Sequence, residues 1–378
     1  MKKLGVLLLV LILLTGQASA AAPETKAKAA VLMDAATGTI LFEQNAHAPL
    51  APASVTKVMT MLLIMEAIDS GQISWEDTVT ASETAAAKGG SQVYLKVGET
   101  MTVADMVKSI AVSSANDCAC AMAEHLAGSE AAFVEKMNAR AEELGMNDTH
   151  FVNCTGLDDD PSAKDHKTSA HDIAVMSREL LVKHPDIKKY TTIWMDTIRG
   201  GAFGLSNTNK MVRYYPGCTG LKTGFTSAAG YCLSASAQRE GMELIAAVMG
   251  SATSQERFAA CKSLLDYGFA NYALYQPAMQ EGASVAVTLG RADSVAAVPE
   301  TAPRLLVEKA KQNTITTEVT LEESVEAPVA QGQQLGTLTV RAGEEILAEV
   351  PLVAETAVEK LSFGDMMARV LRQVAMAG

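Results

Sequence analysis

Beyond the first 20 residues, the hydrophobic pattern is densest at residues 58–65, where apolar side chains fall on every side of a helix and Thr60 is the one polar residue. A helix that is apolar all round is typical of one that passes through a protein core. Pro52 stands just before this stretch, and proline suits the entry of a helix. The pattern therefore predicts a buried helix over residues 53–69.

Helical and strand-like patterns follow one another in blocks through the rest of the first 270 residues. Helical patterns, with Gly128 and Gly145 as stops, cover residues 102–113, 116–127, 130–144 and 170–183. Strand-like segments stand on both sides of them, at 29–33, 39–43, 220–225, 230–237 and 244–250, before a last helix at 253–267. A helical middle between strands from both ends predicts one sheet assembled from distant parts of the chain, with a helical subdomain inserted.

After Phe269 the pattern changes to short strand-like segments separated by turn signals such as Ala342-Gly343. The segments cover residues 285–289, 314–321, 335–341 and 345–353. They carry no cluster of catalytic residue types. We therefore predict a small all-β domain over residues 276–355 that acts as a spacer or docking module.

The end of the chain, residues 356–378, has an amphipathic helical pattern. Its apolar stripe consists of Phe363, Met366, Met367, Val370, Leu371 and Val374. Lys360, Arg369 and Arg372 give it a thin basic side. Such a helix on an exported chain predicts attachment in the membrane interface, with the apolar face among the lipids. The alternative is a helix packed on its own domain or on a partner.

The first 20 residues predict a secretion signal. Lys2 and Lys3 form a charged start, residues 4–14 are an apolar stretch, and Ala18-Ser19-Ala20 is a small-residue cleavage site. The apolar stretch is far shorter than the roughly 20 residues that span a bilayer. We therefore expect an exported protein that lies peripherally on the outer face of the cytoplasmic membrane.

Charge and cysteine content narrow the picture further. The net charge is −12, and the signal would remove two positive charges, so the mature chain is a poor general nucleic-acid binder. Export permits disulfides, but six cysteines allow 15 pairings. We predict mostly buried free thiols, with one or two bridges possible, among Cys118, Cys120, Cys154, Cys218, Cys232 and Cys261.

Ser54 and Lys57 form the only Ser-x-x-Lys of the chain, at the start of the predicted buried helix. Positions i and i+3 of a helix share a face, so Ser54 Oγ and Lys57 Nζ can meet. Burial disfavours the ammonium form of a lysine, and a neutral lysine can take the proton of a serine. The pattern predicts a nucleophile with its base. Taken alone, it also fits a lysine that extends to solvent.

Two further motifs are weak when each is taken alone. Ser114-Ala115-Asn116 opens a helical pattern, where it can be a helix cap. Lys222-Thr223-Gly224 lies on a predicted strand, where it can be a strand end with a solvated lysine. The loop at residues 88–92 can border a cleft. The three motifs occur in a fixed order, each on its expected element, and this combination is a specific signal.

With these three motifs the chain resembles the penicillin-binding D-alanyl-D-alanine carboxypeptidases, which are low-molecular-mass serine peptidases. The likeness covers residues 30–272 and extends more loosely to the end of the chain. Further matching positions are Asp34, Thr37, Gly38, Asp117, Asn207, Asn209 and the segment 264–269. One departure is Ala115, where glycine is common in the family; the functional member of this motif is Asn116.

The resemblance implies an α/β (α+β) domain of the serine β-lactamase and DD-peptidase kind, with a helical subdomain. A small all-β domain and a C-terminal amphipathic helix would follow it. The expected boundaries are a signal peptide at 1–20, the catalytic domain at 21–275, the β-rich domain at 276–355 and the membrane-associating helix at 356–378.

The resemblance also implies a reaction, in which the terminal D-alanine of a peptidoglycan stem peptide is removed through an acyl-enzyme. The implied catalytic residues are Ser54 as nucleophile, Lys57 as base and Ser114 as proton relay. The implied substrate-binding residues are Asn116, Lys222, Thr223, Gly224, Phe225 and Arg257. Among these, the backbone N–H groups of Ser54 and Phe225 would hold the oxyanion. Lys222 and Thr223 would bind the substrate carboxylate with help from Arg257, and Asn116 would hold the substrate amide and orient Lys57.

The expected partners are peptides that end in D-Ala-D-Ala, β-lactams as covalent inhibitors, and the membrane surface through the C-terminal helix. No cofactor, metal or nucleic acid is expected. His166 and His171, with Asp165 and Asp172, are the one metal-like cluster, and a spacing of five does not put two histidines on one helix face.

Several alternatives use the same residues. A serine β-lactamase shares this site, but the mature chain has no Leu-Asn pair, which the class A enzymes carry beside their deacylating glutamate. A penicillin adduct should therefore persist. Weak transpeptidation on the same site stays open. A non-catalytic envelope protein predicts a broken site, whereas all motif residues are present, and the chain has no Gly-x-Ser-x-Gly of a triad hydrolase.

Overall fold

The computed structural model describes residues 22–277, 282–301 and 303–376, except for the side chains of 369, 370 and 372–376. The predicted signal at 1–20 lies outside the described residues. The chain divides into two compact units, of which the first along the sequence is 21–270 and the second contains 271–378. Each unit has its own hydrophobic core, as expected for independently packed parts of a chain.

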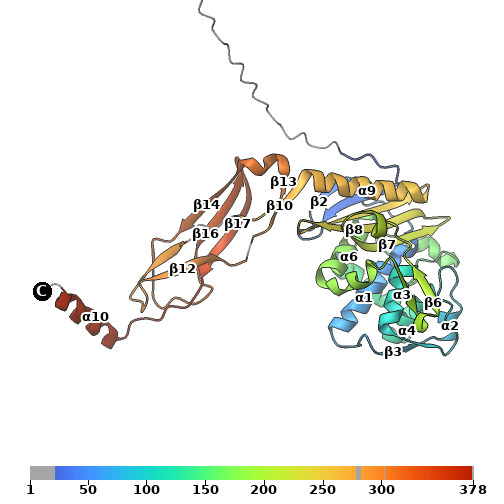
Figure 1. Cartoon of the computed structure of the whole chain (residues 1–378), viewed down its shortest axis with the longest axis horizontal. Helices are drawn as coiled ribbons and strands as arrows, with labels where there is room; N and C mark the ends of the chain where they lie inside the picture. Colours follow the sequence, from blue (N-terminus) through green and yellow to red (C-terminus); the bar gives the residue numbers. More distant parts are fainter. Residues whose placement is uncertain (1–21, 278–281, 302, 377–378) are drawn as a thin grey trace, which may run out of the picture. The chain divides into compact units, whose positions relative to one another are not determined.

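The first unit is built on a five-stranded antiparallel sheet, as Figure 1 shows. In spatial order its strands are β2 (Ile40–Gln44), β1 (Ala29–Asp34), β9 (Met242–Ser251), β8 (Gly230–Arg239) and β7 (Cys218–Thr226). Because β1 pairs with β9, strands from both ends of the unit lie side by side. The predicted sheet of distant segments is confirmed.

Both faces of this sheet are covered by helices (Figure 1). All six residues of β1 are buried; Val31 and Met33 belong to the core that includes α1 (Lys57–Asp69), whereas Leu32 contacts α9 (Ser254–Asn271) on the other face. An added Cβ at Gly268 of α9 would lie 3.0 Å from Leu32 Cδ2, so α9 packs closely on the sheet. A strand buried on both faces has a continuous apolar sequence instead of an alternating one.

The other face of the sheet carries the helical subdomain. Beside α1 it consists of α3 (Val103–Ser113), α4 (Asn116–Ala127), α5 (Glu130–Glu143) and α6 (Ala170–Lys183). Side chains cap three of these helices, since Thr102, Ser129 and Ser169 each accept a hydrogen bond from the backbone N–H three residues on. The predicted helices are confirmed to within a few residues.

Short elements complete the first unit; apart from η1, which begins the helix predicted over residues 53–69, sequence analysis did not predict them. The 3-10 turns are η1 (Ala53–Thr56), η2 (Pro161–Asp165), η3 (Pro185–Ile187) and η4 (Arg199–Gly201). The short helices are α2 (Glu83–Ala86), α7 (Lys188–Thr191) and α8 (Met211–Tyr214). The two-stranded pairs are β3 (Thr78–Thr80) with β4 (Thr100–Thr102), and β5 (Met195–Ile198) with β6 (Phe203–Ser206). Elements of three to five residues are too short to show a hydrophobic period.

The second unit contains a six-stranded sheet. Its spatial order is β14 (Ile315–Leu321), β16 (Gln334–Ala342), β17 (Glu345–Ala354), β12 (Ser294–Pro299), β11 (Ser284–Thr288) and β15 (Ser324–Glu326). A separate pair is formed by β10 (Tyr272–Tyr275) and β13 (Leu305–Glu308), and η5 (Lys309–Thr314) follows it. The β-rich domain predicted from the sequence is confirmed, although β10, β12, β13 and β15 were not predicted.

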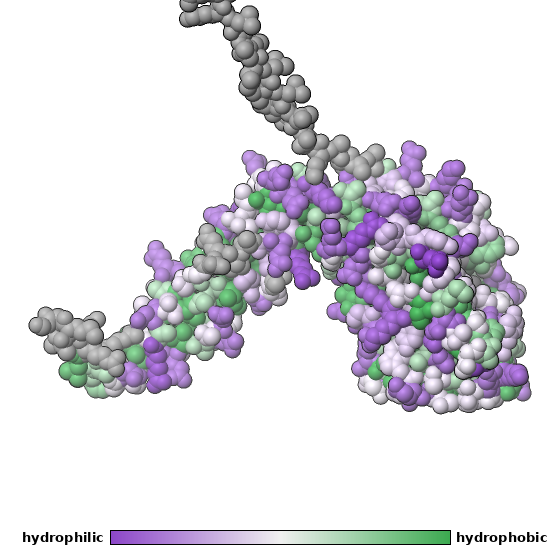
Figure 2. Space-filling view, viewed as in Figure 1, coloured by the Kyte–Doolittle hydropathy of each residue, from purple (hydrophilic) through white to green (hydrophobic). Residues whose placement is uncertain are grey.

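The last helix, α10 (Phe363–Met376), begins after Ser362, whose hydroxyl accepts a hydrogen bond from Asp365 N. Phe363, Met367 and Leu371 are exposed on it, and Figure 2 shows hydrophobic beside hydrophilic surface there. The side chains of Val370 and Val374, also assigned to the apolar stripe, lie outside the described ones. Within residues 22–277, 282–301 and 303–376, no helix combines the length and apolarity needed to cross a membrane.

All six cysteines are free thiols, and five of them are buried, with Cys218 partly exposed. The prediction of mostly buried free thiols is therefore confirmed in this structure. Burial raises the pKa of Cys232 to about 11, so this thiol stays protonated at neutral pH.

Candidate active site

Ser54 and Lys57 lie where η1 leads into α1. Lys57 Nζ donates hydrogen bonds to Ser54 Oγ at 3.1 Å and to the carbonyl oxygen of Thr155 at 2.7 Å. The Lys57 side chain is fully buried, whereas Ser54 is partly exposed. The predicted meeting of the two side chains is therefore observed, in a 3-10 turn instead of the first turn of the α-helix.

Lys57 has the protonation behaviour of a base. Burial lowers its pKa from 10.5 to about 7, and the charges of Cys154 and Asp117 oppose this shift only partly. Desolvation penalises the charged form, so a substantial share of Lys57 is neutral near pH 7. A neutral amine in contact with a serine hydroxyl can accept its proton.

A buried histidine supports the nucleophile turn. The ring of His166 lies 2.8 Å from Thr56 Oγ1 through Nε2, and its Nδ1 accepts a hydrogen bond from Val152 N at 3.1 Å. Because Nδ1 is an acceptor, Nε2 carries the proton and donates to Thr56. Thr56 Oγ1 in turn donates to Ala53 O at 2.8 Å. Sequence analysis considered His166 only as a weak metal ligand and missed this contact.

The second motif lies at the turn between α3 and α4. Ser114 is buried and has a left-handed backbone (φ 63°), which ends α3 so that Asn116 can begin α4. Asn116 Nδ2 donates to Gly89 O at 2.7 Å, and Asn116 N donates to Ser91 O at 2.7 Å. The loop at 88–92 therefore borders the site as predicted. Within the described residues, Asn116 Oδ1 is buried without a hydrogen-bond partner.

Asp117 fixes the continuation of that loop. Its carboxylate accepts hydrogen bonds from Val93 N at 3.1 Å and Leu95 N at 3.0 Å. Such charge-assisted bonds to backbone N–H groups are stronger than neutral ones. The family resemblance identified Asp117 as a matching position, but it did not predict these hydrogen bonds to the loop.

The third motif lies on β7, which runs against η1. A Cβ at Gly224 would lie 2.6 Å from Pro52 O and 3.1 Å from the backbone N atoms of Ser54 and Val55. Glycine is therefore required at this point, because any side chain would push the strand away from the turn that carries Ser54. Phe225 is exposed and its ring stacks on Tyr231 at 4.3 Å, so its side chain faces away from the core.

Lys222 and Thr223 are buried on the same strand. Lys222 Nζ donates to Thr223 O at 2.8 Å, and Thr223 Oγ1 donates to Thr208 Oγ1 at 2.7 Å. Burial, together with the positive charges of Lys57 and Arg257, holds the pKa of Lys222 well below its ordinary value. The charge coupling indicates that the lysines of the first and third motifs face one site.

Arg257 on α9 is buried behind β7. Its Nη1 donates to the carbonyl oxygens of Gly224 at 2.9 Å and Cys232 at 3.3 Å, and its guanidinium lies over the rings of Tyr231 and Phe258. Burial lowers its pKa. In the part of the chain that the structure describes, its Nε is buried without a hydrogen-bond partner. Arg257 therefore braces the end of the third motif.

Two asparagines brace the start of that strand. Asn209 Nδ2 donates to Gly220 O at 3.0 Å, and Asn207 Nδ2 donates to Ile193 O at 2.7 Å. Asn207 Oδ1 accepts from Asn209 N. The segment that carries Thr208 is thereby held against Thr223.

Among the described residues, no three His, Cys, Asp or Glu side chains are arranged to hold a metal ion. His171, which had been considered with His166, contacts Asp172 through Nδ1 at 3.0 Å.

A serine paired with a buried lysine, flanked by a second serine motif and a lysine strand on an antiparallel sheet, defines an active-serine acyl-transfer enzyme. Comparison with known proteins identifies the family. The family profile described as D-alanyl-D-alanine carboxypeptidase matches residues 16–253, and that of the penicillin-binding protein 5 C-terminal domain matches residues 275–360.

Individual relatives agree with these profiles. D-alanyl-D-alanine carboxypeptidase DacF of Bacillus subtilis is 42% identical over 353 residues, which cover 92% of this chain and 89% of that protein. Penicillin-binding protein 5 of Haemophilus influenzae superposes with a TM-score of 0.76 at 30% identity, covering 90% and 100% of the two chains. Penicillin-binding protein D2 of Listeria monocytogenes in its ampicillin-bound form superposes with a TM-score of 0.59 at 33% identity, covering 65% of this chain and 98% of that one.

The chain belongs to the D-alanyl-D-alanine carboxypeptidase family of serine peptidases, and its reaction is removal of the terminal D-alanine from peptidoglycan peptides that end in D-Ala-D-Ala. The sequence-based prediction of fold, enzyme class and reaction is confirmed.

His166 predicts an acid-sensitive fold. Burial lowers the pKa of His166 from 6.5 to about 4, so the folded state favours the neutral form of the ring. The resulting stability is fully present above pH 6.5 and declines as the pH falls toward 4, by about 3 kcal/mol in total. Urea unfolding between pH 7 and 4 should show this slope, and His166→Gln should flatten it. The control variant His47→Gln leaves Thr56 and His166 in place and should retain the pH dependence of the free energy of unfolding. If His166→Gln kept the same pH dependence as the wild-type protein, His166 would not be its source.

Proposed function

We propose that Ser54 is the nucleophile of the carboxypeptidase reaction and Lys57 its general base. The observation that carries this proposal is the 3.1 Å contact between Ser54 Oγ and a fully buried Lys57 Nζ whose pKa is about 7. Lys57 takes the hydroxyl proton while Oγ bonds to the carbonyl carbon of the penultimate D-alanine.

The oxyanion of the tetrahedral intermediate is held by the backbone N–H groups of Ser54 and Phe225. The close approach of Gly224 to Ser54 N supports this pairing, because it brings the two backbone segments together without an intervening side chain. Donors fixed in advance stabilise charge as it develops, without reorganisation during the reaction.

The substrate carboxylate is recognised by Lys222 and Thr223, with Arg257 contributing positive charge and bracing the strand. Burial, and after it the charges of Lys57 and Arg257, destabilise the ammonium form of Lys222 and lower its pKa. A bound carboxylate supplies the missing negative charge and favours that form. The site is therefore suited to a peptide with a free C-terminus.

Asn116 and Ser114 act on the amide that is cleaved. The buried Oδ1 of Asn116, which has no partner among the described residues, suits the N–H of a substrate amide. Ser114 passes the proton from Lys57 to the leaving amine, and D-alanine departs. Water then adds to the carbonyl carbon of the ester and gives a proton to Lys57, which returns it to Ser54 Oγ as the shortened peptide leaves.

A β-lactam acylates the same serine, because its strained amide and carboxylate present the groups that this site recognises. The ampicillin-bound form of Listeria penicillin-binding protein D2 supports the proposal by analogy.

We also propose that the chain is exported and lies peripherally on the outer face of the cytoplasmic membrane, with α10 in the lipid interface. The exposed Phe363, Met366, Met367 and Leu371 support this part.

Incubation with benzylpenicillin should add one drug mass to Ser54, and a diacetyl-Lys-D-Ala-D-Ala peptide should release free D-alanine. Intact mass with peptide mapping and an assay for D-alanine measure the two outcomes. Ser54→Ala should abolish both, whereas Ser70→Ala, on the surface at the end of α1, should change neither. An adduct on a different residue would overturn the assignment of the nucleophile.

The acylation rate should rise with pH through about 7 and level off above it, since only neutral Lys57 accepts the proton. Stopped-flow acylation by a chromogenic β-lactam between pH 5 and 9 measures the profile. In Lys57→Ala the acylation rate should fall by at least about 100-fold, and the inflection near pH 7 should disappear. A rate that is flat across this range would remove Lys57 from the role of base.

Deletion of residues 357–378 should release the protein from membranes, because the apolar side of α10 is lost. Sedimentation with vesicles of anionic phospholipid measures attachment, and penicillin acylation of the truncated form is the control for an intact catalytic unit. Unchanged sedimentation of the truncated form would assign attachment to another part of the chain.

A further inference from the structure

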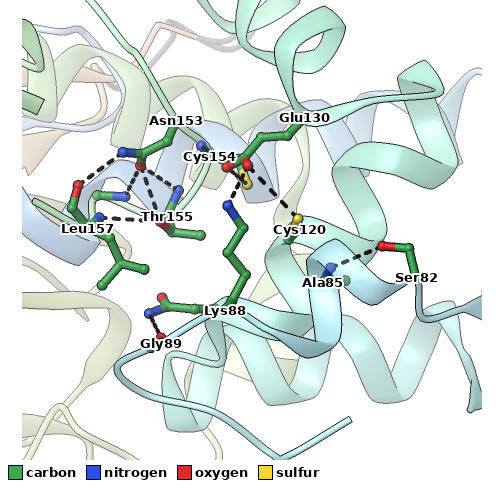
Figure 3. A network of polar contacts seen from close by, with 12 residues as sticks. Ser82, Ala85, Lys88, Gly89, Cys120, Glu130, Asn153, Cys154, Thr155 and Leu157 are labelled. Carbon is green, nitrogen blue, oxygen red and sulfur yellow. Dashed lines mark hydrogen bonds and ion pairs between the residues drawn. The ribbon is translucent and has the colours of Figure 1, made fainter. Parts of the chain in front are cut away.

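The catalytic unit contains a partly buried ion pair that the proposed reaction does not use. Lys88, just after α2, donates from Nζ to Glu130 Oε2 at 2.5 Å, and Glu130 is the first residue of α5 (Figure 3). The side chains are only 21% and 18% exposed. Burial would lower the pKa of Lys88 and raise that of Glu130, but their hydrogen bond and mutual charge shift both in the opposite direction, so both are charged.

Glu130 holds the loop that contacts Lys57. Its Oε1 accepts hydrogen bonds from Cys154 N and Cys154 Sγ, both at 3.2 Å, as Figure 3 shows. The carbonyl oxygen of Cys154 accepts from Thr60 Oγ1 of α1 at 2.6 Å. The next carbonyl along the chain, that of Thr155, is the acceptor for Lys57 Nζ at 2.7 Å. A single peptide unit therefore separates Cys154 N, which Glu130 holds, from the Thr155 carbonyl, which accepts from Lys57 Nζ.

The loop itself is stiff, so a shift at Cys154 reaches Thr155. Asn153 Oδ1 accepts from Thr155 N at 3.1 Å and from Gly156 N at 2.6 Å. A Cβ at Gly156 would lie 1.9 Å from Ala53 O, which shows how closely the loop packs on the nucleophile turn. A packed segment of this kind transmits displacement instead of absorbing it.

Lys88 lies at the start of the second segment that reaches the site. It precedes Gly89, whose carbonyl oxygen accepts from Asn116 Nδ2 at 2.7 Å. A Cβ at Gly90 would lie 2.7 Å from the same Asn116 nitrogen and 3.1 Å from Leu157 Cδ2, so the two segments touch. The ion pair therefore joins the loop that holds Asn116 to the loop that holds Lys57.

We propose that Lys88 and Glu130 are a positioning pair for acylation. Glu130 sets the carbonyl of Thr155 and thereby the direction of the Lys57 amine toward Ser54, and Lys88 sets the carbonyl of Gly89 and thereby Asn116. The proposal rests on the assignment of Lys57 as base in the proposed function. Neither residue touches the substrate, so the pair acts on the rate of acylation more than on binding.

The test uses the full chain and a chromogenic β-lactam. Glu130→Ala removes the acceptor for Cys154 N, so the limiting acylation rate should fall about 10- to 100-fold. The half-saturating β-lactam concentration should change by less than about threefold, because Lys222 and Thr223 are untouched. Glu130→Gln keeps an oxygen at this place and should restore most of the rate. The inflection in the pH–rate profile should also shift in Glu130→Ala, since Lys57 is held differently.

Glu179→Ala is the matched control. Glu179 is also 18% exposed and accepts from Arg140 Nη2 at 2.8 Å, within an ion-pair network of the same unit. This variant should lower the unfolding temperature and leave acylation unchanged. If Glu130→Ala does not fold, Lys88→Met with Glu130→Leu replaces the pair by apolar side chains of similar size, and the same loss of rate is expected.

Wild-type rates and pH profile in folded Glu130→Ala, or in the folded Lys88→Met, Glu130→Leu double variant, would overturn the positioning role, as would equal slowing by Glu130→Ala and Glu179→Ala. Failure of the wild-type protein to form any adduct on Ser54 would instead overturn the proposed function.

Discussion

The site depends on keeping the amine of Lys57 out of water. A lysine without solvent contact is stable only where other groups take its hydrogen bonds, and here Ser54 Oγ and Thr155 O do so. Three separate segments, η1, the loop at 153–157 and β7, close around α1 to exclude water. The same desolvation that weakens the fold lowers the pKa of the amine to about 7, so stability and chemistry are coupled in one side chain.

Much of the architecture could be predicted because its determinants are local. The apolar sequence of α1 and the helices α3 to α6 carry their own period, and Ser54 and Lys57 are three positions apart, so one helical turn brings the pair together. A single sheet built from both ends of the unit followed from the apolar strands there, whereas the particular pairing of β1 with β9 came from the structure. Short pairs such as β5 and β6 left no such pattern in the sequence.

The supporting contacts could not be predicted, because they join residues far apart in the chain. Thr155 lies 98 positions from Lys57, and His166 lies 110 positions from Thr56. A carbonyl oxygen is present in every residue, so no side chain marks Thr155 as the partner of the base. In the sequence, the helix dipole is a sufficient reason for Glu130 at a helix start. Only the folded structure shows that its carboxylate also accepts a hydrogen bond from Cys154 N. The sequence thus predicts candidate reacting groups, whereas the fold is needed to find the residues that contact them.

The electrostatics of the site fit the proposed recognition of a substrate with a free carboxylate. Lys57, Lys222 and Arg257 are all buried, each has a lowered pKa, and the charges of Lys57 and Arg257 act on Lys222. Such a site is short of one negative charge. We propose that a peptide that ends in a carboxylate supplies it and restores the ammonium form of Lys222 without requiring Lys57 to be charged. In the proposed function, binding thereby separates the two lysines by role, with Lys222 as a cation for recognition and Lys57 as a neutral base.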